Sequence, residues 1–230
     1  MQKTAVITGG SKGIGKAICE KLLKNGFKVI SVSRTSKNVQ DLISNYPENF
    51  ISLNYDFENK NEVLFCANEI QKLVSSIDIL VNNAGVFIPG KTLEEEEGAY
   101  EKQMALNIGA PYYFTRSLIC LLEKVDLSYI FNICSTASIT PYINGGSYCI
   151  SKHALLGFTK VLRQECIEKR INVSAVLPGA TLTDSWHGTD LPEERFIKPS
   201  NIADVIFAAW TIKDSACMEE ILIRPIKGDL

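Results

Sequence analysis

The chain has 230 residues, and a hydrophobic content of 46% is enough to bury the core of one full domain. Its 24 Lys and Arg residues are scattered among 26 Asp and Glu residues, which leaves no sustained basic stripe, so a nucleic acid is not an expected partner. No apolar stretch reaches the roughly 18 residues that a membrane span needs, and too few residues precede Ala5 for a secretory signal. We therefore expect a soluble, cytoplasmic protein with no membrane partner.

Cysteine and histidine usage argues against disulfide frameworks and metal sites. The seven cysteines include no C-x-x-C pair, and an odd number cannot close completely into internal disulfides, so a reducing compartment is expected. Cys134 and Cys149 lie beside residues considered below, but small buried thiols that pack as hydrophobes are the simpler interpretation. Two isolated histidines, His153 and His187, cannot supply the usual zinc ligands, and we predict no metal.

Short runs rich in Val and Ile alternate with longer amphipathic stretches, which is typical of βαβ units around a parallel sheet. The predicted strands are residues 3–8, 27–32, 50–54, 78–82, 128–134, 171–177 and 220–224. The predicted helices are residues 13–25, 36–45, 59–75, 94–108, 110–125, 147–169 and 200–212. No linker divides the chain, so we predict one α/β domain over residues 1–230. It is a Rossmann-type doubly wound parallel sheet of about seven strands with helices on both faces and its ligand at the carboxyl ends of the strands.

A glycine-rich turn joins the first predicted strand to the first helix. Gly9, Gly13 and Gly15 follow Thr8 in the spacing G-x-x-x-G-x-G, which differs from the G-x-G-x-x-G fingerprint of dinucleotide sites. Residues without a Cβ let the backbone approach a pyrophosphate and present amides at the positive end of a helix. The alternative is an ordinary strand-to-helix turn.

The end of the second predicted strand indicates which dinucleotide fits. An NAD site usually places a carboxylate there to bind the adenosine ribose, but this stretch ends Ser33-Arg34. The guanidinium of Arg34 suits a phosphate, and Lys12 in the glycine turn offers a second cation. We therefore predict NADP, the alternative being that both cations are solvated surface charges.

The acidic run from Glu94 to Glu97 follows a helix-start signal. Thr92 is placed to cap a helix, and Glu95 three residues later would complete a capping box. Carboxylates in a first helical turn oppose the positive end of the helix dipole. We expect these four side chains to face solvent rather than to bind a metal or a partner.

Tyr148 and Lys152 are four residues apart in a helical pattern, so their side chains lie on one helix face. Free tyrosine titrates near ~10, which suits proton transfer at neutral pH poorly. A neighbouring ammonium would stabilise the phenolate and lower that pKa. The pair therefore predicts a proton-transfer site.

Six segments in order along nearly the whole chain resemble classical short-chain dehydrogenases/reductases. They are the turn Thr8-Gly9-x-x-x-Gly13-x-Gly15, Asn82-Asn83-Ala84-Gly85, Asn107, Ser135, Tyr148-Cys149-Ile150-Ser151-Lys152, and Pro178-Gly179. Each alone is weak, but together they identify the chain as a member of that family. In the alternative, non-catalytic interpretation, Tyr148 is a packing residue, Ser135 supplies a loop hydroxyl and Asn107 is a polar group at a helix end.

This resemblance implies roles for individual residues. Tyr148 would protonate the oxygen of a carbonyl that receives hydride from NADPH, Ser135 would orient that oxygen, and Asn107 would hold a water linking Lys152 to solvent. Lys152 would also bind the nicotinamide ribose. The implied cofactor-binding residues are Gly9, Ser11, Lys12, Gly13, Ile14, Gly15, Ser33, Arg34, Asp56, Phe57, Asn83, Ala84, Gly85, Tyr148, Lys152, Pro178, Gly179, Thr181 and Thr183.

The segment around residues 184–198 lacks regular periodicity and predicts a short lid over a small-molecule carbonyl substrate. Within it, Trp186 is the expected substrate contact and His187 an exposed loop histidine. The chain ends Arg224-Pro225-Ile226-Lys227-Gly228-Asp229-Leu230 without the glycine pair common in 3-oxoacyl thioester reductases. That ending, together with Tyr148-Cys149-Ile150-Ser151-Lys152 and Trp186 in a short lid, is more similar to bacterial sepiapterin-reductase-like members, which implies small diketones or pterin side chains as substrates.

Other functions stay open on the sequence alone. A 3-oxoacyl thioester (acyl-carrier-protein) reductase and an oxidative alcohol dehydrogenase share these residues. A protein of another class, an NADP-sensing binding module without catalysis, would have no need of the Tyr148–Lys152 pair. Since the family often assembles as dimers or tetramers, we also expect a homodimer or homotetramer through helices near 94–125 and 147–169.

Overall fold

The computed structural model describes residues 2–186 and 188–229 of the chain. Seven parallel strands form one sheet in the order β3-β2-β1-β4-β5-β6-β7. The strands are β1 (Thr4–Thr8), β2 (Lys28–Ser33), β3 (Phe50–Asn54), β4 (Ile79–Asn82), β5 (Ser128–Ile133), β6 (Ile171–Pro178) and β7 (Glu220–Ile223). The predicted Rossmann-type doubly wound sheet is confirmed, and its strand order reverses between β1 and β4.

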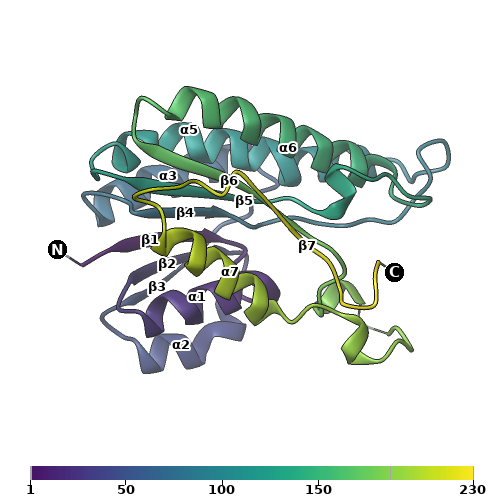
Figure 1. Ribbon diagram of the computed structural model, residues 1–230, viewed down its shortest axis with the longest axis horizontal. Coiled ribbons are helices and arrows are strands. Elements are labelled where there is room, and N and C mark those ends of the chain that lie inside the picture. The colour runs from purple at the N-terminus through teal and green to yellow at the C-terminus, as the bar shows by residue number, and fades with distance from the viewer. Residues whose placement is uncertain (1, 187, 230) are drawn as a thin grey trace.

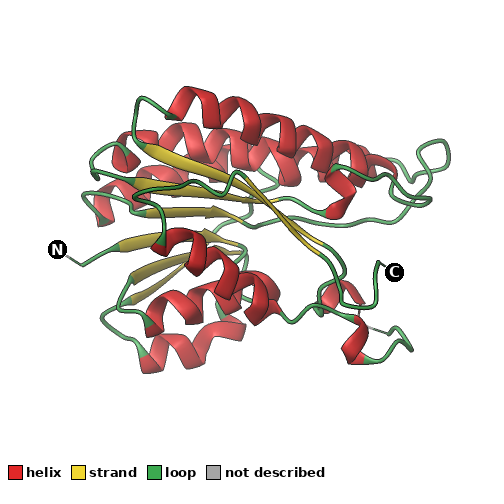
Figure 2. Cartoon of the chain, viewed as in Figure 1, coloured by secondary structure: helices red, strands yellow, loops and turns green. Residues whose placement is uncertain are grey.

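Helices cover both faces of the sheet (Figures 1 and 2). The longer ones are α1 (Gly13–Lys24), α2 (Gln40–Asn45), α3 (Lys60–Leu73), α4 (Ala99–Met104), α5 (Ala110–Leu122), α6 (Gly146–Cys166) and α7 (Pro199–Thr211). Short 3₁₀ turns lie at η1 (Lys37–Val39), η3 (Thr136–Ser138), η4 (Asp184–Trp186) and η5 (Glu193–Arg195). In Figure 1, α3, α5 and α6 lie above the sheet and α1, α2 and α7 below it.

Alternate residues of the central strands face two different cores. Ala5 and Ile7 of β1 pack with α1, α2 and α7, whereas Val6 between them packs with α3 and α5. All three are fully buried. A strand buried on both faces reads as a continuous apolar run, which is why the Val- and Ile-rich segments predicted the sheet.

The predicted helix over residues 94–108 was wrong at its start. α4 begins at Ala99, and residues 94–98 form no helix. The predicted capping box of Thr92 and Glu95 is therefore absent, because Glu95 instead accepts hydrogen bonds from Ser147 at the start of α6. A contact across 52 residues outweighs the local helix-start signal.

The helices predicted over 94–108 and 110–125 are joined by a π-helical turn, η2 (Ala105–Gly109), between α4 and α5. Pro111 follows this turn and has no backbone N–H to donate to a regular α-helical ladder. Asn107 lies within the widened turn and is fully buried. Such turns are frequent at functional sites.

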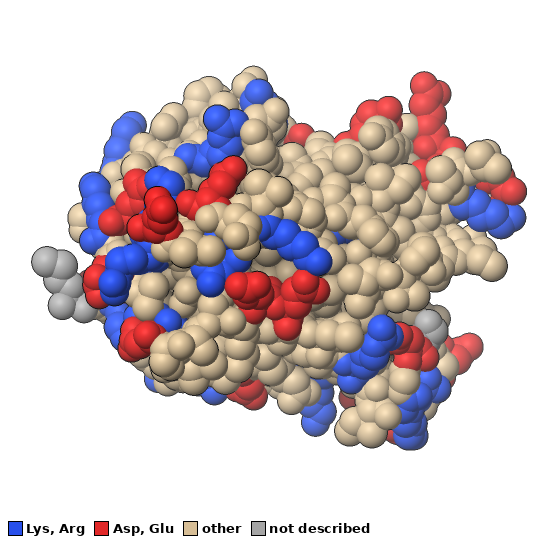
Figure 3. All heavy atoms as spheres, turned by 45° about the horizontal axis from the view of Figure 1, so that its top comes forward, with Lys and Arg blue, Asp and Glu red and all other residues tan. Residues whose placement is uncertain are grey.

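None of the helices in the described part of the chain is long and apolar enough to be a membrane span. Within residues 2–186 and 188–229, no cluster of three or more His, Cys, Asp or Glu side chains is arranged to hold a metal ion. In Figure 3, acidic and basic side chains are interspersed at the left and the lower right of the face, and the broad region between them is uncharged. All seven cysteines are unpaired, and Cys134 and Cys149 are buried as predicted.

Candidate active site

The glycine turn lies at the carboxyl end of β1, beside the carboxyl end of β4. Gly9 has φ +66°, and a Cβ at this position would lie 2.8 Å from Asn83 Nδ2. The first amides of α1, which starts at Gly13, have no acceptors within the helix. Turn and helix start together form a backbone cradle suited to a phosphate group.

Asn83 and Thr8 hold the two strand ends together. The Asn83 Nδ2 atom donates to the carbonyls of Thr8 at 2.9 Å and Gly9 at 3.1 Å. The Thr8 hydroxyl accepts from the backbone N–H groups of Asn83 at 2.9 Å and Ala84 at 3.0 Å. The side chain of Asn83, predicted to bind cofactor, is therefore committed to shaping the turn.

The two cations predicted to bind a phosphate are both exposed and both face carboxylates. Arg34 Nη1 lies 3.9 Å from Glu58 Oε1, with 70% of its side chain exposed. Lys12 Nζ lies 2.6 Å from Asp184 Oδ2 of η4. Ser33 donates its hydroxyl to the carbonyl of Thr35 at 2.9 Å. These exposed cations can exchange their partners for a ligand phosphate at little cost, since exposed ion pairs contribute little stability.

Asp56 and Phe57 follow β3 on the same edge of the sheet. Asp56 Oδ1 accepts from the backbone of Glu58 at 3.1 Å. The ring of Phe57 is buried and packs edge-to-face on Phe114, with centroids 4.9 Å apart. Only the backbone of Phe57 therefore remains to contact a nucleotide.

Tyr148 and Lys152 lie in the first turns of α6, as predicted. Lys152 is 5% exposed, and its Nζ atom donates to the Ile133 carbonyl at the end of β5 at 2.8 Å. The same Nζ atom lies 5.8 Å from the centroid of the Tyr148 ring. Ser135 follows β5 and caps η3, where its hydroxyl accepts from the Ala137 amide at 3.1 Å.

Burial moves the pKa values of this pair in opposite directions. It raises the pKa of Tyr148 from 10.0 to about 12, although a hydrogen bond with the Ser135 side chain acts to lower it. It lowers the pKa of Lys152 from 10.5 to about 8, against a smaller opposing effect of Cys134. The expectation that the pKa of Tyr148 is lowered was therefore wrong, because desolvation of the phenolate is the largest effect on it.

Asn107 makes three hydrogen bonds that connect two parts of the site. Its Oδ1 atom accepts from the Val86 N–H at 2.8 Å, and its Nδ2 atom donates to the Val86 carbonyl and to Ser151 Oγ, each at 2.9 Å. Ser151 lies in α6 between Tyr148 and Lys152. Asn107 thus holds the wall after β4 against the catalytic helix, while its predicted contact with a water stays a prediction.

A cavity of about 400 Å³ lies at the carboxyl ends of the strands and brings half of the predicted site residues together. Its predicted lining residues are Ile14, Asn83, Gly85, Ser135, Tyr148, Lys152, Pro178, Gly179, Thr181, Thr183 and Trp186. The side chain of Thr181 donates to the Gly179 carbonyl at 3.0 Å. Trp186 is half-buried and packs on Phe196 with centroids 5.1 Å apart. His187 lies outside the described residues.

Sequence reasoning missed several residues that line this cavity. Phe87 and Tyr142 form an aromatic wall, and the Phe87 ring packs edge-to-face on Tyr148 with centroids 4.9 Å apart. Asp229 enters from the chain end and forms an ion pair with Arg224. The position of Phe87, directly after the Asn82–Gly85 and Val86 segment, was a usable signal. Nothing local marks Tyr142 or Asp229, which reach the cavity only through the fold.

A parallel sheet with this order has a glycine turn after β1, Ser135 after β5, and Tyr148 and Lys152 in α6. We compared the chain with known proteins on this basis. The sequence model of the family described as short chain dehydrogenase matches residues 3–193. The chain belongs to the short-chain dehydrogenase/reductase family. It is therefore an oxidoreductase that acts on CH–OH or carbonyl groups.

Individual relatives of this dehydrogenase span nearly its whole length. A 3-oxoacyl-[acyl-carrier-protein] reductase of Buchnera aphidicola is 31% identical over 219 residues, covering 90% of each chain. A sepiapterin reductase of Chlorobaculum tepidum is 27% identical over 241 residues, covering 100% of this chain and 99% of its own. A metagenomic short-chain oxidoreductase solved in complex with NADP superposes with a TM-score of 0.84 at 28% identity, covering 97% and 96% of the two chains.

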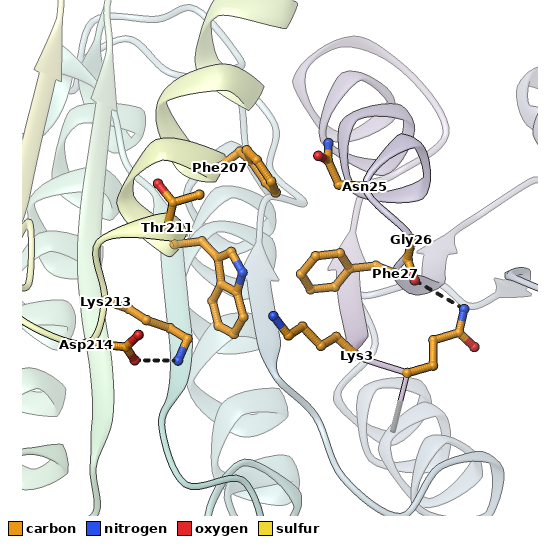
Figure 4. Close-up of a pocket in the computed structure, with 10 residues that line it drawn as sticks. Lys3, Asn25, Gly26, Phe27, Phe207, Thr211, Lys213 and Asp214 are labelled. Carbon is orange, nitrogen blue, oxygen red and sulfur yellow. Dashed lines mark hydrogen bonds and ion pairs between the residues drawn. The ribbon is translucent and has the colours of Figure 1, made fainter.

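The dehydrogenase has a larger cavity, of about 550 Å³, at the opposite end of the sheet (Figure 4). Lys3 Nζ lies 6.0 Å from the Phe27 ring centroid and 5.3 Å from that of Trp210. Lys213 Nζ lies 4.7 Å from the same Trp210 ring and pairs with Asp214 at 3.0 Å. These rings and charges partner one another, and the cavity is remote from the carboxyl ends of the strands where ligands of this fold bind.

Proposed function

We propose that this dehydrogenase is an NADPH-dependent reductase that converts a small ketone or diketone to an alcohol. The observation that carries the proposal is the cavity at the carboxyl ends of the strands, where Ser135, Tyr148 and Lys152 converge beside the segment after β6. A hydroxyl, a phenol and an ammonium suit the protonation of an oxyanion.

The protonation states of Tyr148 and Lys152 at neutral pH favour reduction. A Tyr148 pKa of about 12 keeps the phenol protonated at neutral pH, so that it can donate a proton rather than accept one. A Lys152 pKa of about 8 leaves the ammonium mostly charged there. A phenol that holds its proton beside a buried cation is ready to quench a developing alkoxide.

The reaction balances with the residues at hand. NADPH, when bound, supplies the hydride that forms the new C–H bond at the carbonyl carbon. As the carbonyl π electrons move onto oxygen, Ser135 donates a hydrogen bond to that oxygen and Tyr148 transfers its proton to it. Lys152 stabilises the resulting phenolate until a solvent proton restores it.

Two cations support NADPH over NADH. Arg34 after β2 and Lys12 in the glycine turn are the cations that we assign to the 2′-phosphate, and the exposed ion pairs that they make are readily exchanged. The end of β2 carries no carboxylate for the ribose hydroxyls of NAD. The NADP complex of the metagenomic relative agrees with this choice.

Three finer assignments belong to the same proposal. Residues 1–230 act as one domain, residues 184–198 act as the substrate lid with Trp186 as a contact, and the protein is a homodimer or homotetramer. A parallel bridge between Thr181 and Ile197 closes the base of that segment. The aromatic side chains of Phe87, Tyr142 and Trp186 favour a small, planar substrate.

The test is an NADPH-oxidation screen with 3-oxoacyl thioesters, diketones, sepiapterin-like pterins and simple aldehydes. We expect turnover with ketones or diketones, lowered about 1000-fold by Tyr148→Phe. Tyr100→Phe, on the exposed face of α4, is the matched control and should keep full activity. Near-normal turnover by Tyr148→Phe would refute the mechanism. Tight NADPH binding with no turnover on any substrate would favour a sensing module instead.

A further inference from the structure

The start of the catalytic helix lacks a cap of its own. The first amides of an α-helix have no acceptors within the helix, and Gly145, at the N-cap of α6, has no side chain to supply one. Tyr148 is the third residue of this helix. Its position therefore depends on whatever holds the first turn in place.

Glu95 supplies the missing acceptor from a segment distant in the sequence. Its Oε1 atom accepts from the Ser147 backbone N–H at 2.7 Å and from the Ser147 hydroxyl at 2.9 Å. The approach is close because Gly146 has φ +26° and no side chain, and a Cβ there would collide with Glu95 Oε1. A carboxylate at a helix N-terminus is also favoured by the helix dipole.

Ser147 is also linked, through Gln103, to the segment that carries Phe87 in the wall of the cavity. Gln103 Nε2 donates to Ser147 Oγ at 2.6 Å, and Gln103 Oε1 accepts from the Ile88 N–H at 3.0 Å. Gln103 is fully buried and Ser147 is 1% exposed. Buried polar groups that satisfy one another in this way rigidify the elements that they join.

Both ends of this network adjoin the reacting phenol. Ser147 precedes Tyr148 in the chain, and Ile88 follows Phe87, whose ring contacts Tyr148 edge-to-face. The Gly90 N–H also donates to the Asn144 carbonyl at 3.0 Å, which fixes the same two segments together. The network therefore fixes the Tyr148 phenol on two sides, through its own helix α6 and through the Phe87 ring that contacts it.

The other three carboxylates of the acidic run from Glu94 to Glu97 are not hydrogen-bonded to the start of α6 as Glu95 is. Glu94 pairs with Lys91 at 3.0 Å, and Glu96 and Glu97 are exposed. The acidic run thus contains one carboxylate engaged with the catalytic helix and neighbours that share its charge but not its contacts. That contrast provides a control within the chain.

We propose that Glu95 is a positioning residue for catalysis, which caps α6 and, through Ser147 and Gln103, holds Tyr148 and Phe87 in their reactive arrangement. The proposal rests on the proposed function, since it gives Tyr148 the role of proton donor. Glu95 itself touches no substrate and acts through the helix start.

The experiment compares Glu95→Ala with Glu96→Ala in the full-length protein, using the best substrate of the NADPH-oxidation screen. Glu95→Ala should lower kcat about tenfold, because a misplaced donor slows proton transfer. The affinity for NADPH, measured by fluorescence titration, should stay unchanged. The solvent deuterium isotope effect on kcat should increase as proton transfer becomes more rate-limiting. Glu96→Ala should leave all three quantities as they are.

Conservative variants separate positioning from charge and from folding. Glu95→Gln keeps an acceptor oxygen at the same reach and should restore kcat to within about threefold of the wild type. Glu95→Asp keeps the charge but shortens the side chain, and should behave like alanine. If Glu95→Ala does not fold, this Gln and Asp pair still decides the matter.

An unchanged kcat and isotope effect in folded Glu95→Ala would overturn the inference, as would an equal loss in Glu96→Ala. Full activity of Glu95→Asp together with a loss in Glu95→Gln would also overturn it, because charge alone would then be responsible. Failure of the proposed function has a different signature, namely turnover that survives Tyr148→Phe. Low turnover in Tyr148→Phe with normal turnover in Glu95→Ala would reject the positioning role alone.

Discussion

The cofactor cradle and the catalytic face are built in different ways, although both lie at the carboxyl ends of the strands. The cradle at β1 and β4 is mostly backbone, shaped by Gly9 and by the bonds between Thr8 and Asn83. The catalytic face depends on side chains from separated segments and buries the ammonium of Lys152. The cradle therefore depends on the absence of side chains, whereas the catalytic face carries the electrostatic cost of a buried charge.

The largest effect is expected at that buried charge. Lys152→Met should lower kcat about 1000-fold and at the same time raise the free energy of unfolding at pH 7 by about 1–3 kcal/mol. The reason is that burial lowers the pKa of Lys152 from 10.5 to about 8, so that folding with a charged Lys152 is unfavourable. Urea unfolding and steady-state kinetics measure the two effects.

The stability difference between Lys152→Met and the wild type should depend on pH. Between pH 8 and 10.5 the unfolded chain binds the Lys152 proton and the folded protein has released it, so wild-type stability gains from this group as the pH rises. The advantage of Lys152→Met should be largest below pH 8 and shrink toward pH 10. Lys160→Met, on the exposed side of the same helix, should show neither the gain nor the loss of activity. A constant difference across the pH range would contradict the buried-charge explanation.

The cradle should respond to an added methyl group. Gly9→Ala should weaken NADPH binding about 30-fold and lower the free energy of unfolding by about 2 kcal/mol. The causes are the positive φ of +66° and the clash with Asn83 Nδ2 at 2.8 Å. Fluorescence titration and urea unfolding test both effects.

Gly26→Ala separates backbone strain from loss of the cradle. Gly26 has φ +80° with no atom within 4 Å of an added Cβ, and it lies at the other end of the sheet. The variant should lose about 1 kcal/mol of stability and keep its affinity for NADPH. Equal NADPH affinities in Gly9→Ala and Gly26→Ala would show that the glycine turn does not bind the cofactor.

The same contrast explains what could be predicted from the sequence. The doubly wound sheet and its seven strands were predicted, with strand ends placed within a residue or so, because strands buried on both faces are continuous apolar runs. The glycine turn was recognisable because only glycine tolerates its backbone there. The family was identified from ordered local segments of this kind, and the family match confirms it.

The parts that were missed depend on contacts between distant segments. Nothing near Glu95 indicates that its partner is Ser147, so the helix start was placed at residue 94. The sign of the Tyr148 pKa shift was wrong because helical spacing reveals a nearby ammonium but not the burial of the phenol. The roles of the individual site residues stay predictions until they are tested.

The smallest effect is expected at Arg34, at the exposed edge of the cradle, which we propose determines the preference for NADPH over NADH. Arg34→Asp should weaken NADPH binding about tenfold and strengthen NADH binding, because a carboxylate repels the 2′-phosphate and accepts from ribose hydroxyls. The effect is limited because Arg34 is largely exposed and already faces Glu58 at 3.9 Å. The ratio of the two dissociation constants is the measurement. Arg170→Asp, another exposed arginine that pairs with Asp126 away from the cavity, should leave that ratio unchanged. An unchanged ratio in Arg34→Asp would show that Arg34 does not bind the 2′-phosphate, and its assignment to NADP recognition would be wrong.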